Sequence, residues 1–341
     1  MTDQHEKKPS TYAKAGVDIR KENLAIKGIS GWLEKTFKFR EGKTGSVMKG
    51  IGGYANMLEL GDYALAMTTD GVGSKVLVAQ ELDKYDTVGI DCIAMNVNDL
   101  ICVGAEPIAM VDYLAMESVN EDMTSKISIG LYEGAQLAGI AIVGGETATL
   151  PEIIAGVNNK GFDLAGTAIG IVKKDRILMG DDIIPGDTVV GMESSGIHSN
   201  GLTLARKVLP KTMWSQLLRP TRIYVKEVLS ILNEFPVHGL AHITGSAFLK
   251  LRRLTKYGFV LDNMPEPDMI FKKIQELGEV ADEEMYRTFN MGIGFCVITD
   301  EESAKGIVEK YGKEYKLDNI GKVVEDKQIT IKKNDVTLKL E

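Results

Sequence analysis

A strand-like segment that runs into glycines and charged side chains is the feature that most constrains this chain. The apolar run Tyr63–Met67 predicts a buried strand, and Thr68–Lys75 (TTDGVGSK) follows it directly. Glycines let backbone N–H groups approach a ligand, because no side chain intervenes. Asp70 offers the oxygen ligand that magnesium prefers, and Lys75 offers a cation for phosphate oxygens. The segment therefore fits a metal–triphosphate site, with a plain acidic turn as the alternative.

The next segment predicts a helix with polar groups at the border of the core. Between Thr87 and Val103, apolar residues recur at helical spacing. Asn96 and Asp99 are three residues apart, so they share one helix face. Polar groups at such a place need hydrogen-bond partners or a bound ion. We expect either a satisfied polar pair or further ligands for the cation beside Asp70.

Two other glycine-rich stretches extend this pattern. The apolar run Ile140–Val143 predicts a strand that enters GGETATLP, which makes Glu146 a third metal-ligand candidate or a cap of the following turn. Gly42–Tyr54 holds five glycines, which fits a loop near phosphates or a simple surface loop.

The second half of the chain carries candidate substrate contacts. The sequence ESSGIHSNG precedes a predicted helix at Leu202–Leu209, where Ser199 or Asn200 can act as the cap. Small polar residues at a helix N-terminus present free N–H groups to an anion. His198 lies in that segment and is either a substrate contact or a structural residue. Further on, Ser246 is expected to cap a helix at 247–257.

Length and composition narrow the class of protein. A chain of 341 residues predicts two domains, which we divide within the charged segment Lys173–Gly186: 1–10 disordered, 11–175 and 176–341. A net charge of −8 argues against non-specific nucleic-acid binding. Residues 1–10 are polar, so we expect no signal peptide, and no apolar run is long enough to span a bilayer. With three scattered cysteines read as buried free thiols, we expect a cytoplasmic protein without membrane contact.

Nine segments follow one another along nearly the whole chain in an order that can be compared with known families. They are Tyr12–Ile19, Asp70–Lys75, Asn98–Pro107, Gly144–Ala148, Asp163–Gly166, Ser194–Gly201, Arg219–Thr221, His242–Gly245 and Phe289–Gly294. Each segment is weakly specific alone, but their order is strongly specific. In this order the chain resembles the phosphoribosylformylglycinamidine cyclo-ligase family, the aminoimidazole ribonucleotide synthetases of purine synthesis.

The resemblance implies an ATP-dependent ring closure with magnesium. In this family the formyl oxygen of formylglycinamidine ribonucleotide attacks the γ-phosphate of ATP. The ribose-linked nitrogen then attacks the activated carbon and phosphate leaves, giving aminoimidazole ribonucleotide, ADP and phosphate. Phosphorylation helps because phosphate is a better leaving group than an amide oxygen. The protein mainly positions the reactants and stabilises charge.

The resemblance also implies roles for individual residues. Asp70, Asp99 and Glu146 are expected to bind magnesium. His198, Ser199, Asn200 and Thr244 are expected on the ribonucleotide side. His198 or His242 is expected to move a proton, although His242 lies in an apolar alternation that also predicts core burial. Lys75 is expected to act on the phosphates. The full expected ATP-binding set is Gly52, Gly53, Asp70, Gly71, Gly73, Ser74, Lys75, Asn98, Asp99, Gly144, Gly145, Glu146 and Thr147.

The fold that the resemblance implies is α+β with two domains. The N-terminal domain has a mixed sheet that forms a barrel across a homodimer, and the C-terminal domain is an α/β sandwich. The active site is expected in the cleft between the domains and near the partner chain.

Some segments depart from the family pattern. Thr149–Glu152 (TLPE) replaces EMPG, Ser246–Ala247 replaces two of three glycines, Leu249–Leu254 (LKLRRL) replaces ENxPR, and Ser74 replaces Thr. An ATP-using relative with another small phosphorylated substrate is therefore one alternative. A nucleotide-binding regulatory module without activity is another, and the intact Asp70, Lys75, Asp99 and Glu146 argue against it.

Overall fold

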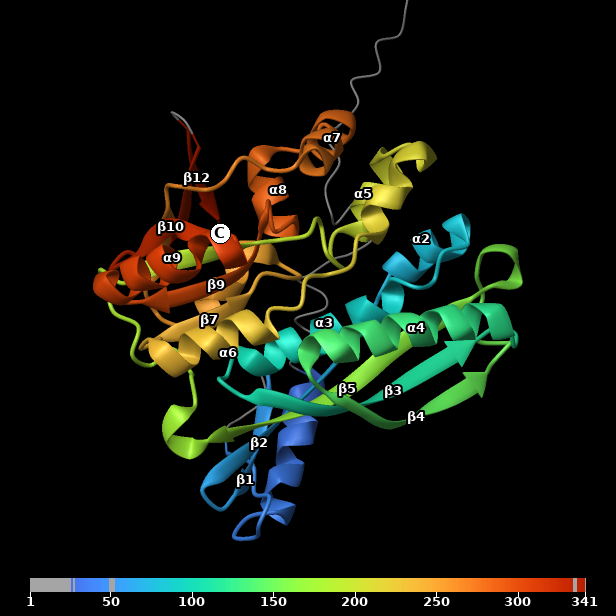
Figure 1. The fold of residues 1–341 in the computed structure, drawn as a ribbon, viewed down its shortest axis with the longest axis horizontal. Coiled ribbons are helices and arrows are strands. Elements are labelled where there is room, and N and C mark those ends of the chain that lie inside the picture. Colours follow the sequence, from blue (N-terminus) through green and yellow to red (C-terminus); the bar gives the residue numbers. More distant parts are fainter. Residues whose placement is uncertain (1–25, 27, 49–52, 334–335, 341) are drawn as a thin grey trace, which may run out of the picture.

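The computed structural model describes residues 26, 28–48, 53–333 and 336–340. Two sheets divide the chain, the first ending at Lys173 and the second beginning at Thr188. Figure 1 shows them as the cores of two adjacent domains, with helices of both domains at the junction. The predicted two-domain α+β architecture is therefore present.

The N-terminal sheet is mixed and open. Its strands lie in the order β1-β2-β5-β3-β4, and only β3 and β4 are parallel neighbours. Among the described residues no barrel closes within one chain, because β1 and β4 lie at opposite ends of the strand order and do not pair with each other. The strands are β1 (Asn56–Leu60), β2 (Tyr63–Gly71), β3 (Glu106–Met116), β4 (Ala141–Thr149) and β5 (Phe162–Lys173).

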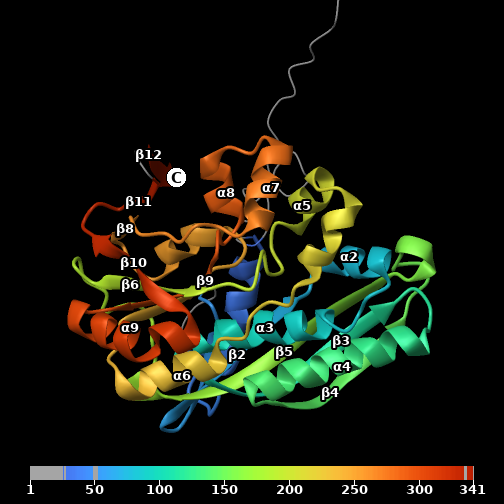
Figure 2. The same ribbon diagram turned by 45° about the horizontal axis from the view of Figure 1, so that its top comes forward.

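Helices cover one face of this sheet (Figure 1): α2 (Lys75–Leu82), α3 (Val88–Ile101) and α4 (Glu121–Ala138). Helix α3 is almost entirely buried, as its apolar repeat predicts. Close packing of α3 on α4 depends on Gly89, since a Cβ there would lie 2.2 Å from the backbone nitrogen of Leu131. The opposite face of the sheet carries none of these three helices (Figure 2), and the described helical segment before β1, which ends in the 3₁₀ helix η1 (Glu34–Phe39), has no buried residue in η1.

The C-terminal domain has a seven-stranded sheet in the order β12-β11-β8-β10-β6-β9-β7. Among its described strands β8 and β11 are parallel and the other neighbouring pairs are antiparallel, so the sheet is largely antiparallel. The strands are β6 (Thr188–Glu193), β7 (Gly239–His242), β8 (Gly258–Leu261), β9 (Ile293–Thr299), β10 (Leu317–Val324), β11 (Ile329–Lys333) and β12 (Val336–Leu340). The helices are α5 (Leu202–Val208), α6 (Val225–Glu234), α7 (Met269–Gly278), α8 (Asp282–Thr288) and α9 (Glu301–Tyr315).

The domains meet along α3, which contacts α6 and β7 of the C-terminal domain. Figure 2 shows α3 beside α6 at this junction. All three cysteines are buried free thiols, as predicted. No helix in the described part of the chain is long and apolar enough to cross a membrane.

Several local expectations about where elements begin and end were wrong. Strand β2 continues through Asp70 to Gly71, because the segment pairs with β5. Neither Ser199 nor Asn200 caps α5, whose N-cap is Gly201 with φ +71°. Ser246 lies in a left-handed conformation with φ +66°, makes no side-chain cap, and precedes a 3₁₀ helix, η5 (Ala247–Arg253).

Candidate active site

An imidazole–carboxylate pair joins the two domains. His242 at the end of β7 places Nδ1 2.8 Å from Oδ1 of Asp99 on α3, and its Nε2 lies 3.4 Å from the amide nitrogen of Asn98. The Asn98 amide donates, so Nε2 accepts and Nδ1 carries the proton toward Asp99. Burial lowers the pKa of His242, although Asp99 opposes this shift. The ring is therefore held neutral and in one tautomer.

Asp70 and Asp99 belong to one electrostatic cluster. Oδ1 of Asp70 accepts from the backbone N–H of Gly71 at 2.7 Å, and the Asn96 amide donates to the Asp70 carbonyl at 3.1 Å. Burial raises the pKa of the Asp70 carboxyl, and the negative charge of Asp99 adds to this rise. Burial also opposes ionisation of Asp99, but Lys250 and His242 outweigh it and hold its pKa below the usual value. The structure thus brings two of the three predicted carboxylates together.

Glu146 does not join that pair within one chain. It lies in the edge strand β4 and pairs in register with Tyr113, whereas Asp70 and Asp112 both pair with Gly166. Successive residues of a strand point to opposite faces, so Glu146 and Asp70 point to opposite faces of the sheet. Three strand spacings separate β2 from β4, which is roughly 14 Å at about 4.8 Å each.

Lys75 is engaged in the domain interface. It is the first residue of α2, is wholly buried, and places Nζ 2.8 Å from the Asp91 carboxylate. The same ammonium donates to the Arg219 carbonyl at 2.6 Å. Burial lowers the pKa of Lys75, and Asp91 opposes the shift. The expected phosphate cation is thus bound to protein groups on both sides of the interface.

Asp91 is the centre of that interface network. Its Oδ1 accepts from the backbone N–H and the hydroxyl of Thr221, at 2.7 and 2.6 Å, and from the Ser199 hydroxyl at 3.1 Å. Asn98 similarly accepts from Tyr224 N at 3.0 Å and donates to the Arg222 carbonyl at 2.8 Å. Ser199 and Asn98, expected to contact ligands, therefore connect the domains.

The remaining residues of the predicted phosphate region are dispersed. Gly71 lies in β2, Gly73 forms the turn before α2 with φ +66°, and the Ser74 hydroxyl lies 3.3 Å from the Thr203 hydroxyl. Gly53 precedes the buried Tyr54, and Gly52 lies outside the described residues. The other three, Gly144, Gly145 and Thr147, are part of the edge strand β4.

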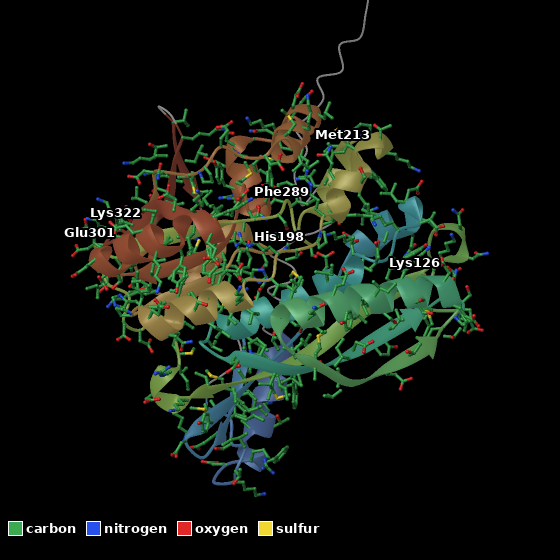
Figure 3. The ribbon with its side chains drawn as sticks, viewed as in Figure 1. Lys126, His198, Met213, Phe289, Glu301 and Lys322 are labelled. Atoms are coloured by element: carbon green, nitrogen blue, oxygen red, sulfur yellow. The ribbon has the colours of Figure 1, made fainter. Side chains whose placement is uncertain are left out.

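His198 is a buried residue at the centre of the molecule (Figure 3). Its Nε2 accepts from the Ser195 backbone N–H at 3.3 Å, and its ring packs near Tyr224 with centroids 6.3 Å apart. Burial moves the pKa of His198 well below its ordinary value. A neutral ring in this place organises the loop between β6 and α5.

Asn200 lies close to Gly245, the residue after Thr244. A Cβ built on Gly245, next to Thr244, would lie 3.3 Å from Oδ1 of Asn200. The Asn200 amide nitrogen is buried and has no hydrogen-bond partner among the described residues. The Thr244 hydroxyl accepts from the Lys250 ammonium. A buried donor without a partner needs a ligand or water, which fits the predicted substrate role of Asn200.

Sequence reasoning missed several residues of this region. One feature of the sequence could have pointed to Asp91: it lies within the apolar repeat of a buried helix, where a carboxylate needs a partner. Lys250 and Arg253 lie in the segment that departs from the family pattern, and both stand over the Tyr54 ring, at 5.4 and 5.9 Å from its centroid. No sequence motif marks Tyr54. Burial raises the pKa of its hydroxyl well above the ordinary value.

Comparison with known proteins identifies the family. Residues 52–172 match the N-terminal domain of AIR synthase related proteins, and residues 185–334 match their C-terminal domain. The chain is 54% identical to the phosphoribosylformylglycinamidine cyclo-ligase of Pyrococcus horikoshii, covering 96% of this chain and 99% of that protein. The chain belongs to the phosphoribosylformylglycinamidine cyclo-ligase family. This confirms the resemblance and the ring-forming ligase of purine biosynthesis expected from the sequence.

Other cyclo-ligases and more distant structures agree with this membership. The enzyme of Methanocaldococcus jannaschii is 52% identical, covering 94% of this chain and 93% of that protein. A ThiL complex with AMPPCP and TMP has a TM-score of 0.63 at 17% identity, covering 91% of this chain and 96% of the other. A PurL of T. maritima, complexed with ADP, has a TM-score of 0.59 at 17% identity, covering 86% of this chain and 46% of that one. These two likenesses concern the fold.

Proposed function

We propose that this cyclo-ligase performs the ATP-dependent ring closure of formylglycinamidine ribonucleotide at the domain interface around Asp99 and His242. The formyl oxygen bonds to the γ-phosphorus as the bond to ADP breaks. The ribose-linked nitrogen then bonds to the formyl carbon, phosphate leaves with the former formyl oxygen, and the nitrogen loses its proton. The observation that carries the proposal is the Asp99–His242 contact, which joins both domains at the carboxylate cluster of a family member.

ATP is supported by the fold and by the chemistry of this cluster. Structures of the same fold are described with ADP and with AMPPCP. Among the described residues, no three His, Cys, Asp or Glu side chains gather closely enough to hold a metal ion by themselves. Magnesium is commonly held by one or two carboxylates together with phosphate oxygens and water. Asp70 and Asp99 fit that donor set, and bound magnesium would shield the phosphates.

The protein groups have distinct roles in this proposal. His242 orients the Asp99 carboxylate and is the histidine we assign to proton handling, because its ring is tied to the cluster. His198 shapes the substrate loop. Asn200 and Thr244 contact the ribonucleotide, with the unpartnered Asn200 amide as a donor.

We also propose a homodimer through the uncovered face of the N-terminal sheet. Val111 and Tyr113 on β3 are 42% and 41% exposed, large values for apolar side chains within a sheet. Met67, Ile169 and Ile171 lie half-buried in neighbouring strands. Helices α2–α4 already cover the other face, and an apolar patch left exposed on a sheet is typical of a protein–protein interface, so a second copy would bury it.

Incubation of the purified protein with magnesium, ATP and formylglycinamidine ribonucleotide tests the proposed function. We expect equal amounts of aminoimidazole ribonucleotide, ADP and phosphate. ATP hydrolysis without the aminoimidazole product would favour a relative with another substrate. Nucleotide binding without turnover of the ribonucleotide would favour a regulatory module.

A further inference from the structure

Lys250 is a buried lysine at the proposed site, and it belongs to no family motif. Lys250 is the fourth residue of η5, whose chain follows β7 and the buried Thr244. Its Nζ donates to the Thr244 hydroxyl and lies 5.4 Å from the centroid of the Tyr54 ring. Two residues outside η5, Thr244 and Tyr54, therefore contact this ammonium.

The backbone before Lys250 is tightly constrained. Ser246 and Ala247 both have positive φ, +66° and +42°, although neither is glycine. Such conformations cost free energy and persist where the surrounding structure enforces them. The turn directs η5 back over the His242–Thr244 segment, as the Lys250–Thr244 contact shows.

Lys250 faces the carboxylate cluster without forming a direct ion pair. Its charge favours the ionised forms of both Asp70 and Asp99. Yet among the described residues no carboxylate lies within ion-pair distance of its Nζ, and its hydrogen-bond partner there is the neutral Thr244 hydroxyl. An ammonium has three donors, so two remain without a partner among the residues that the structure describes and could bind an incoming anion.

Lys75 presents the opposite case. Its ammonium contacts Asp91 and the Arg219 carbonyl, and its exposed fraction is 0%. Lys250 keeps 9% exposure, and the Asp99 side chain keeps 14%. The corner beside Asp99 is thus the more accessible one, and the Lys250 ammonium there has no anionic partner within the described part of the chain.

We infer that Lys250 is a catalytic residue of this chain that contacts phosphate oxygens, and that the phosphate is the γ-phosphoryl group of ATP. The inference rests on the proposed function. As the γ-phosphoryl group moves from ADP to the formyl oxygen, negative charge spreads over its equatorial oxygens. The Lys250 ammonium stabilises that charge by hydrogen bonding, and no proton is transferred. The sequence assigned this role to Lys75.

The test compares Lys250→Met, Lys250→Arg and Lys256→Met. Met keeps the length and apolar stem of Lys250 while removing its charge, and Arg restores a cation. Lys256 is an exposed cation of the same region and serves as the matched control. For Lys250→Met we expect kcat to fall about 100-fold, the usual effect of losing one preorganised donor. Lys250→Arg should regain part of the rate, and Lys256→Met should match the wild type.

Calorimetric binding of Mg·ADP and of the non-hydrolysable analogue AMPPCP locates the contact independently of turnover. Lys250→Met should bind Mg·ADP as the wild type does and AMPPCP at least tenfold more weakly. A higher KM for formylglycinamidine ribonucleotide with unchanged AMPPCP binding would overturn the γ-phosphoryl assignment and place the contact at the ribose phosphate. Unchanged kinetics and unchanged binding of both nucleotides in Lys250→Met would overturn the inference entirely.

Two controls distinguish these outcomes from a loss of folding. The thermal unfolding temperature of Lys250→Met should match that of the wild type. If Lys250→Met is unfolded, the same kinetic and binding measurements are made on Lys250→Arg, which keeps the positive charge. If the wild type binds AMPPCP through Lys250 but forms no aminoimidazole product, the proposed function fails while the phosphate contact stands.

Discussion

Oδ1 of Asp99 and Nδ1 of His242 lie 2.8 Å apart, although 143 positions and a domain boundary separate the two residues in the chain. The contact joins helix α3 of the N-terminal domain to β7, an edge strand of the C-terminal sheet. It gives the site a carboxylate of fixed orientation, and its geometry depends on the domains being correctly docked.

Replacing Asp99 by Asn should lower turnover by at least about 100-fold and raise the magnesium concentration needed for half-maximal rate, because a charged ligand is lost. A magnesium titration of the steady-state rate measures both effects. Glu146→Gln should have a smaller effect, since its side chain points to the other face of the sheet. Equal magnesium shifts in both variants would show that Glu146 reaches the metal after all.

The Lys75–Asp91 ion pair should contribute to the free energy of unfolding. Lys75→Met leaves Asp91 buried without its cation, which should cost about 3–5 kcal/mol in the free energy of unfolding. Denaturant unfolding measures this loss, and the double variant Lys75→Met with Asp91→Leu should recover part of it. If Lys75→Met keeps wild-type stability while the KM for ATP rises, Lys75 is a nucleotide contact, as the sequence suggested.

Acid should destabilise the protein through His198. Burial holds its folded pKa well below the unfolded value of about 6.5. As pH falls below 6.5, the unfolded chain takes up a proton that the folded ring resists, so stability present above that pH is progressively lost. His198→Asn should flatten the fall in Tm between pH 7.5 and about 5, because Asn tolerates the φ of +58°. An unchanged slope would assign the acid sensitivity to other groups.

The proposed dimer predicts a specific effect of charge on the open sheet face. Val111→Glu places a carboxylate in the centre of that face and should shift sedimentation from dimer to monomer. Val119→Glu, at another exposed valine outside the face, should leave the dimer intact. Dimers in both variants, or a monomeric wild type, would contradict the interface.

Local sequence patterns predicted most of the helices and strands. The partners of the site residues depend on contacts between residues that are distant in sequence. The helical repeat of 87–103 predicted α3 to within two residues at each end. Nothing local showed that Asp70 would be drawn into a strand by pairing with Gly166, or that α2 would begin at Lys75. The motif predicted that Lys75 contacts phosphates. In the structure Lys75 forms an ion pair with Asp91, and this pairing depends on tertiary packing that no local pattern shows. The sequence did not indicate a role for Lys250, because the segment that contains it departs from the family pattern.

The most direct test of the central claim follows the formyl oxygen. Formylglycinamidine ribonucleotide labelled with ¹⁸O at the formyl group is converted with magnesium and ATP, and the released phosphate is analysed by mass spectrometry. The account predicts one ¹⁸O atom in each phosphate formed, in equal amount to aminoimidazole ribonucleotide. Unlabelled phosphate, with the label lost to water, would contradict activation of the formyl oxygen by phosphorylation.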